Sequence, residues 1–184
     1  MNVDAPELVL SRAQPRTRDV ETFEAVMRAH ERQVLGTAFR LLGRMEDAQD
    51  AAQEVFTRLF RHLKSFDSDE DVARWLYRVT VNVCHDVWKK RRPMSDITEL
   101  NLASGVADPE TAAGELERQR AVVNGLATLA HKERAALVLR EVEGLSTREV
   151  AEILGSSEVT VRTQICTARM KLKKFTERRL RNKR

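Results

Sequence analysis

Apolar residues recur at three- and four-residue steps along most of this chain, the spacing of residues that share one face of an α-helix. The first such stretch runs from residue 22 to Gly43, a residue suited to the left-handed conformation that ends helices. A second stretch covers residues 47–63, and a third follows the polar segment 65–71, whose Ser and Asp side chains can cap neighbouring backbone groups. The pattern therefore predicts three consecutive helices in the N-terminal half.

The third predicted helix has two different faces. Its apolar positions form one stripe: Val72, Trp75, Leu76, Val79, Val83 and Val87. Polar and basic residues share another face: Arg74, Arg78, Asn82 and Lys89. Pro93 disfavours helix in the residue before it and marks the end of this half. We expect one side of the helix to pack in a core and the other to be able to meet an anion, with Trp75 in the core and Trp88 and Tyr77 able to pack or to stack.

The C-terminal half begins after a stretch with scattered apolar residues, residues 94–114, which is typical of a linker. Residues 116–129 and 133–142 predict two further helices, the second of which is stopped by Gly144. The linker separates two helical halves.

Ser146 and Glu149 form a capping box, in which each side chain bonds a backbone amide at a helix start. Gly155 then turns the chain, and Ser157 can cap a last helix. The apolar stripe of that helix is Val161, Ile165, Ala168 and Leu172. A short helix, a tight glycine turn and a longer helix predict a helix-turn-helix.

The second helix of such a unit can enter the major groove of DNA, where its outward N-terminal side chains read base edges. The candidates are Glu158, Thr160, Arg162, Thr163, Cys166 and Thr167. Arg162 is the best single candidate for a strong contact. Lys171 belongs to the basic stretch 169–184, in which Glu177 is the only acid and which suits attraction to phosphate. The alternative is a helical hairpin whose basic end is simply solvated.

Composition supports an all-α protein. Of the 184 residues 42% are hydrophobic and 33% charged, and only 7 Gly and 4 Pro interrupt the chain. We expect two small helical domains joined by a flexible linker. The net charge of +4 is compatible with a polyanionic partner, but it is too small to indicate one by itself.

The same sequence argues against several other classes of protein. Cys84 and Cys166 are far apart, and the four histidines are scattered, so neither a disulfide, a metal site nor another cofactor is expected. No apolar run approaches the roughly 20 residues that span a bilayer, and no secretory signal pattern opens the chain, so a cytoplasmic location is expected. No nucleophile–base pair or carboxylate constellation predicts an enzyme.

Two independent sets of motifs stand out in the chain. The first set is residues 47–56 (DAQDAAQEVF), 65–67 (SFD) and 75–82 (WLYRVTVN), and the second set is residues 139–146 (LREVEGLS), 149–155 (EVAEILG) and 160–162 (TVR). The first set resembles region 2, and the second resembles region 4, of the extracytoplasmic-function (ECF) sigma factors of the sigma-70 family. The resemblance covers residues 22–172, with both sets in the expected order and spacing.

The resemblance implies a division of labour along the chain. Together with the pattern of residues, which gives a flexible arm at 1–19, a linker at 93–115 and a basic tail at 177–184, it assigns 20–92 to region 2 and 116–176 to region 4. The acidic and amide side chains of the second helix would dock core RNA polymerase: Asp47, Asp50, Gln53 and Glu54. Asn82 and the loop 65–71 would open the minus-ten promoter element, and region 4 would read the minus-thirty-five element. An anti-sigma factor is a further expected partner.

Three alternatives keep these implications open. The protein could be a freestanding helix-turn-helix regulator that binds DNA without polymerase, or, as the weakest alternative, a nucleic-acid enzyme. The acids of the second helix could form an ordinary solvated face. The chain also departs from the family pattern, with Gln164 and Thr167 where many members carry arginines and Ala130 where a proline usually opens region 4.

Overall fold

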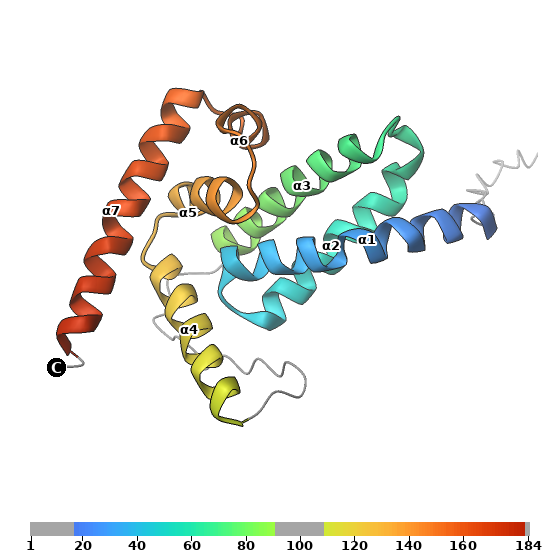
Figure 1. Cartoon of the computed structure of the whole chain (residues 1–184). Coiled ribbons are helices and arrows are strands. Elements are labelled where there is room, and N and C mark those ends of the chain that lie inside the picture. The colour runs from blue at the N-terminus through green and yellow to red at the C-terminus, as the bar shows by residue number, and fades with distance from the viewer. Residues whose placement is uncertain (1–16, 91–108, 183–184) are drawn as a thin grey trace, which may run out of the picture.

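The computed structural model describes residues 17–90 and 109–182, and all regular structure within these ranges is helical. The elements follow one another as α1 (Thr17–Leu42), α2 (Met45–His62), the short 3₁₀ turn η1 (Leu63–Ser65), α3 (Asp69–Lys90), α4 (Pro109–Ala127), α5 (His131–Leu137), the π-helical segment η2 (Val138–Val142), α6 (Thr147–Leu154) and α7 (Glu158–Asn182) (Figure 1). The predicted all-α fold is confirmed. Most of the predicted N-terminal arm and of the predicted linker lies outside the described residues.

The first three helices form a bundle. Gly43 has a φ of 78° and turns the chain between α1 and α2, as its position after the first apolar stretch predicts. Leu41, Leu59 and Leu76, one from each helix, are fully buried. The Ser68 hydroxyl accepts a hydrogen bond from the Asp71 amide at 3.2 Å and caps the start of α3.

Helix α3 is buried along more than the predicted stripe. Val72, Leu76, Val79 and Val83 are buried as expected, whereas Trp75 is half-buried and packs on Phe66 and His62. Thr80, Val81 and Cys84 are buried as well, because α3 contacts α1 and α2 on one side and α6 on another. The buried surface of this helix therefore packs on two sides, against α1 and α2 on one and against α6 on the other.

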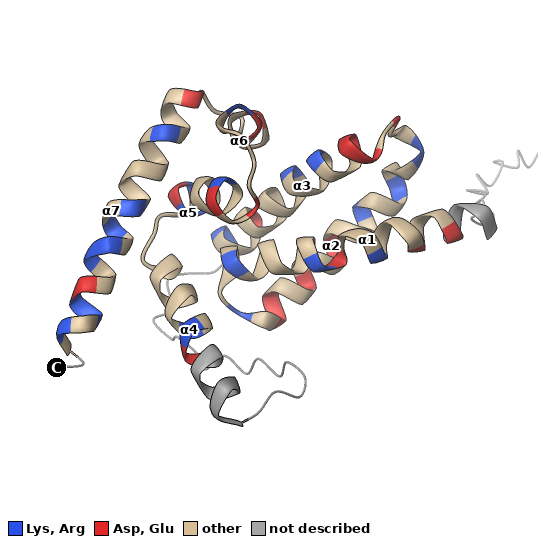
Figure 2. Ribbon diagram, viewed as in Figure 1, with Lys and Arg blue, Asp and Glu red and all other residues tan. Residues whose placement is uncertain are grey.

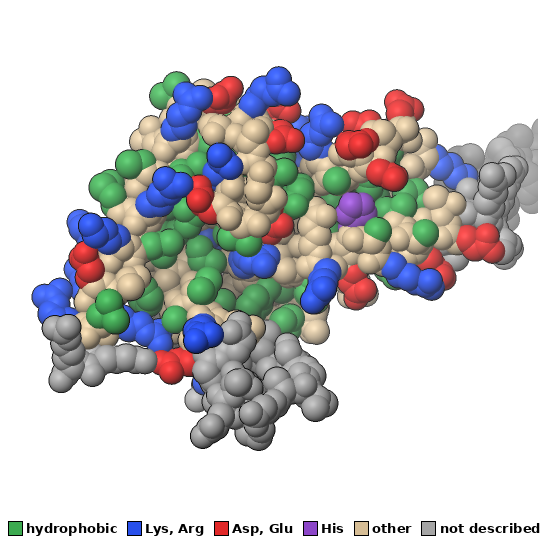
Figure 3. Space-filling view, viewed as in Figure 1, with side chains coloured by type: hydrophobic (Ala, Val, Ile, Leu, Met, Phe, Trp, Pro, Cys, Tyr) green, Lys and Arg blue, Asp and Glu red, His purple; other side chains and the backbone are tan. Residues whose placement is uncertain are grey.

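The second helical unit begins earlier than the pattern of apolar residues predicts. Helix α4 starts at Pro109, a residue whose fixed φ suits the first helical position, rather than at residue 116. Gly125 faces α7, where an added Cβ would lie 3.2 Å from a Leu172 methyl carbon, so the glycine permits the close approach of α4 and α7. The face in Figure 3 shows hydrophobic side chains gathered between these two helices.

The helix-turn-helix has the predicted local geometry. The Ser146 amide donates to Glu149 Oε2 at 2.8 Å, while the Glu149 amide donates to the Ser146 hydroxyl at 3.2 Å. Gly155 ends α6 in the left-handed conformation, with φ 58°. The Ser157 hydroxyl accepts from the Thr160 amide at 3.1 Å at the start of α7. Because each contact spans at most one helical turn, sequence alone specifies them.

The two helical units pack against each other. Helix α1 contacts α4, α5 and η2, and α3 contacts α6 (Figure 1). Buried apolar residues of both units belong to one continuous cluster. Among the described helices, none is long and apolar enough to cross a membrane.

Candidate nucleic-acid interface

The polar face of α3 is exposed as predicted. The side chains of Arg74, Arg78, Asn82 and Lys89 are all exposed to solvent. Arg74 keeps 51% of its side chain accessible although its guanidinium lies 3.9 Å from an Asp71 oxygen. The structure thus brings these four side chains together on one helix, where they can meet a nucleic-acid backbone or an unpaired base.

The start of α7 presents a second polar surface. Thr160, Arg162, Thr163 and Cys166 are exposed, while Glu158 and Thr167 are half-buried. The Arg162 guanidinium lies 2.7 Å from Glu158 Oε2, one helical turn away, and 64% of the Arg162 side chain remains accessible. Lys and Arg positions continue along the rest of α7 (Figure 2). This helix has the exposed N-terminal surface that a recognition helix needs.

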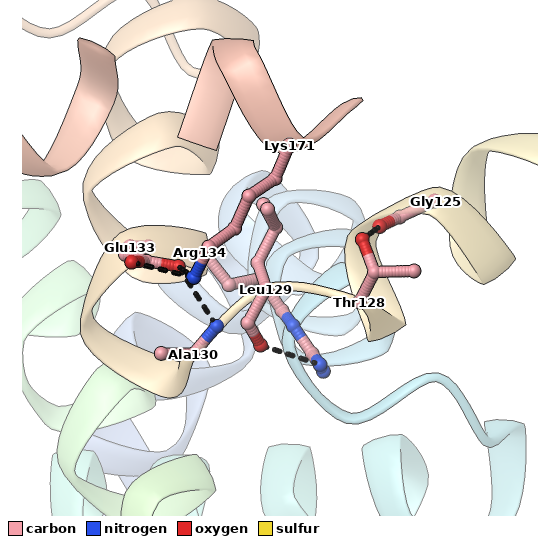
Figure 4. Close-up of polar contacts among 7 residues, drawn as sticks. All are labelled: Gly125, Thr128, Leu129, Ala130, Glu133, Arg134 and Lys171. Carbon is pink, nitrogen blue, oxygen red and sulfur yellow. Dashed lines mark hydrogen bonds and ion pairs between the residues drawn. The ribbon is translucent and has the colours of Figure 1, made fainter. Parts of the chain in front are cut away.

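Lys171 has a different environment from the other candidates on α7. Its ammonium lies 2.7 and 2.9 Å from the two Glu133 carboxylate oxygens, which ties α7 to the start of α5 (Figure 4). The hydrogen bond from Lys171 and that from the Ala130 amide hold the pKa of Glu133 below its usual value. The Ala130 amide, 3.0 Å from Glu133, uses a donor that a proline would lack. Lys171 therefore has a structural contact in addition to its predicted role.

The predicted docking residues lie on α2. Asp50, Gln53 and Glu54 are exposed and Asp47 is half-buried. Glu54 pairs with Arg58 at 2.8 Å, one turn further along the helix. The exposed acids form an accessible surface on the N-terminal bundle.

Sequence reasoning missed the residues that join the two units. Arg134 is 8% exposed, and its guanidinium donates to the Leu41 carbonyl at 2.6 Å. It also donates to the Leu129 carbonyl at 3.4 Å (Figure 4). Burial lowers the pKa of Arg134. Arg78 donates to the Glu152 carbonyl at 3.2 Å, so one of the candidate DNA contacts already touches α6.

Two histidines meet where α3 lies near α5. The ring centroids of His85 and His131 are 4.6 Å apart, and His131 is 8% exposed. Burial, and then the positive charges of His85, Arg134, Lys132 and Lys89, lower the pKa of His131 to about 4. No group of three or more His, Cys, Asp or Glu side chains in the described residues could hold a metal ion, and both cysteines are free.

Two family matches cover most of the described chain. Residues 26–93 match Sigma-70 region 2, and residues 118–172 match Sigma-70 region 4. The chain is 30% identical over 172 residues to the ECF RNA polymerase sigma factor SigW of Bacillus subtilis, covering 88% of this chain and 92% of SigW. It is 32% identical over 174 residues to the RNA polymerase sigma-H factor of Pseudomonas aeruginosa, covering 89% and 90% of the two chains. The chain belongs to the ECF sigma factors, the RNA polymerase subunits that direct promoter-specific initiation.

Solved structures agree with this assignment. CnrH in complex with the cytosolic domain of CnrY has a TM-score of 0.62 at 28% identity, covering 86% of this chain and 89% of that one. The sigma factor RpoE in complex with the anti-sigma factor NepR from Bartonella quintana has a TM-score of 0.66 at 18% identity, covering 88% and 98%, and supports the fold.

Proposed function

We propose that this sigma factor contacts core RNA polymerase through α2 and promoter DNA through α3 and the start of α7. The observation that carries the proposal is the pair of exposed polar faces, one in each sigma region of the chain. Residues 20–92 would dock polymerase and open the minus-ten element, and residues 116–176 would read the minus-thirty-five element. Residues 93–115 would link the two.

The energy for opening DNA would come from binding. The sequence contains no GxxxxGK[ST] phosphate loop, so nothing in it indicates that this chain hydrolyses ATP. Unstacking one base-pair step costs about 1.4 kcal/mol on average, and extruding a base costs a few kcal/mol. Binding of an extruded base near Asn82, together with contacts of Arg74, Arg78 and Lys89 to the DNA backbone, would offset that cost.

We expect Asn82→Ala to reduce open-complex formation by the holoenzyme about tenfold, which corresponds to about 1.4 kcal/mol. Alanine removes an amide that can bond a base edge and leaves the helix intact. Permanganate footprinting of unpaired thymines measures the effect. Asn182→Ala is the matched control, because Asn182 is an exposed asparagine at the end of α7, far along the chain from α3. Normal thymine reactivity with Asn82→Ala would count against its role.

We expect Arg162→Ala to weaken holoenzyme binding about tenfold on a promoter with an intact upstream element, and only slightly when that element is scrambled. An arginine bonded to a guanine edge discriminates by about 1–3 kcal/mol, whereas a phosphate contact does not depend on sequence. Arg28→Ala is the control, because Arg28 also pairs with a glutamate one turn away. Equal losses on both promoters would assign Arg162 to the backbone.

Three further expectations belong to the same proposal. We infer that an anti-sigma factor restrains this chain, since the sigma factor RpoE was solved in complex with the anti-sigma factor NepR, and CnrH in complex with the cytosolic domain of CnrY. The chain would act in the cytoplasm, where core polymerase and promoters are found. It would be a specificity subunit without catalytic activity of its own. Affinity capture of the tagged chain from cells of its source tests the expectation of an anti-sigma factor. The capture is done once with and once without added core polymerase, and the captured proteins are compared.

A further inference from the structure

A cavity of about 240 Å³ lies where α3, the start of α5 and the helix-turn-helix meet (Figure 1). It is smaller than the roughly 300–1,000 Å³ of pockets that hold drug-sized ligands. Since a molecule of liquid water takes about 30 Å³, the cavity has room for a ligand of about ten non-hydrogen atoms. Polar side chains from all three parts of the chain line it: Asn82, His85, His131, Lys132, Ser156 and Gln164.

The surroundings of the cavity are positively charged. Lys132 lines it and is exposed to solvent. Burial lowers the pKa of His131 to about 4, and the positive charges of His85, Arg134, Lys132 and Lys89 add to that effect. The described residues that line the cavity include no Asp or Glu. A cavity in such a field favours an anionic ligand over a metal cation.

The wall of the cavity also has hydrogen-bonding capacity that the described residues leave unused. His131 Nε2 and Gln164 Oε1 are buried and have no hydrogen-bond partner within the described part of the chain. Buried polar atoms without a partner are unfavourable, and the last torsion of both side chains is broad enough to turn these atoms toward a ligand. Because an amide oxygen can only accept, Gln164 favours a ligand that carries a hydroxyl or an amine.

Polar bonds between the helices hold the walls of the cavity in place. The Glu143 carboxylate, which follows η2, accepts from the Thr37 hydroxyl at 2.8 Å and from the Tyr77 hydroxyl at 3.3 Å. Arg78 of α3 donates to the Glu152 carbonyl of α6 at 3.2 Å. A wall that is already fixed does not have to be ordered by the ligand, which favours binding.

We propose that this cavity binds a small organic acid, either a carboxylate or a phosphate monoester, that also carries a hydroxyl or an amine. Lys132 would pair with the acid group, to which Asn82 and Ser156 can donate hydrogen bonds. Gln164 Oε1 would accept from the hydroxyl or amine. The inference goes beyond the proposed function and does not depend on it, because it concerns the chain without polymerase or DNA.

Isothermal titration calorimetry of the full chain with malate and with glycerol 3-phosphate tests the proposal. Both probes are small, and each carries a hydroxyl beside its acid groups, whereas glycerol is the uncharged control. We expect one site with a Kd of about 1 mM or tighter for at least one of the two acids, and no binding of glycerol. The acid that binds more tightly tells whether the site prefers a carboxylate or a phosphate. No saturable binding of either acid, or equal binding of glycerol, would overturn the proposal.

Substitutions in the wall distinguish the cavity from general attraction to a basic chain. Lys132→Gln should weaken binding about tenfold, because it removes the charged partner of the acid group. Gln164→Leu keeps a side chain of similar size and should weaken binding about threefold. Lys174→Gln is the matched control, since it removes the same charge at an exposed position of α7 and should leave the Kd within a factor of two. Equal effects of the two lysine substitutions would overturn the site.

Nuclear magnetic resonance of the unsubstituted chain locates the ligand without any change of sequence. The backbone amide signals of Gly155 and Ser156, which line the cavity, should shift as the bound acid is added. The signal of Gly144, which follows η2 and lies outside the lining, should stay in place. Shifts that leave Gly155 and Ser156 unaffected would place the ligand elsewhere and overturn the assignment of this cavity.

Discussion

The double variant Asp50→Lys, Glu54→Lys is expected to bind core RNA polymerase at least about a hundredfold more weakly than the wild-type chain. Both acids are exposed on α2 and form part of the proposed docking surface. The proposed polymerase surface complements the two acids, so lysines in their place bring like charges together. Such a contact costs several kcal/mol, and every 1.4 kcal/mol is a factor of ten in affinity. Fluorescence anisotropy of labelled chain titrated with core polymerase measures the loss.

The control is Glu21→Lys, Glu31→Lys, which changes the net charge equally at exposed positions of α1. It should leave affinity within a few-fold of wild type, since long-range effects of net charge are screened at physiological salt. Equal losses of affinity in both double variants would mean that net charge alone causes the effect, and that α2 is not part of the docking surface.

The second large effect that we expect is that the free energy of unfolding depends on pH through His131. Its pKa lies near 4 in the folded chain, while an unfolded histidine titrates near 6.5. Between these values the unfolded state binds more protons, so stability falls as pH falls. We expect His131 to account for a loss of about 2 kcal/mol between pH 7.5 and pH 5, and about 3 kcal/mol in full.

Urea unfolding of wild type and His131→Gln at the two pH values measures this contribution, because the carboxylates that titrate at the acidic end are common to both chains. Wild type should lose about 2 kcal/mol more than the variant over this interval. Parallel losses in the two chains would show that His131 is not held neutral by its burial.

Contacts within one helical turn were predictable. The reciprocal bonds of Ser146 and Glu149, the left-handed Gly155 and the cap at Ser157 follow from residue types at fixed short spacings. The helix-turn-helix was therefore fully visible in the sequence.

Contacts between the regions were not predictable in the same way. Thr37 and Glu143 are 106 residues apart, and no periodic pattern links such positions. A partial signal did exist, because Thr80, Val81 and Cys84 give α3 more buried surface than a single stripe provides. An apolar surface of that width indicates a second packing partner, although it does not name one.

Sequence could place the candidate site residues on their faces but could not show what each one touches. Lys171 reads as one basic residue among many in the stretch 169–184, yet its ammonium is held by Glu133, 38 residues earlier. Exposure, by contrast, follows from the helical repeat: the four polar positions of α3 are exposed as expected, and so are Thr160, Arg162, Thr163 and Cys166 of α7, whereas Glu158 and Thr167 are half-buried.

Transcription in vitro with purified core polymerase and a promoter library tests the central claim most directly. The account predicts initiation only when both core polymerase and this chain are present, at promoters that share two separated elements. Tight binding of the chain alone to a single operator, with no initiation when core polymerase is added, would contradict it and favour a freestanding regulator.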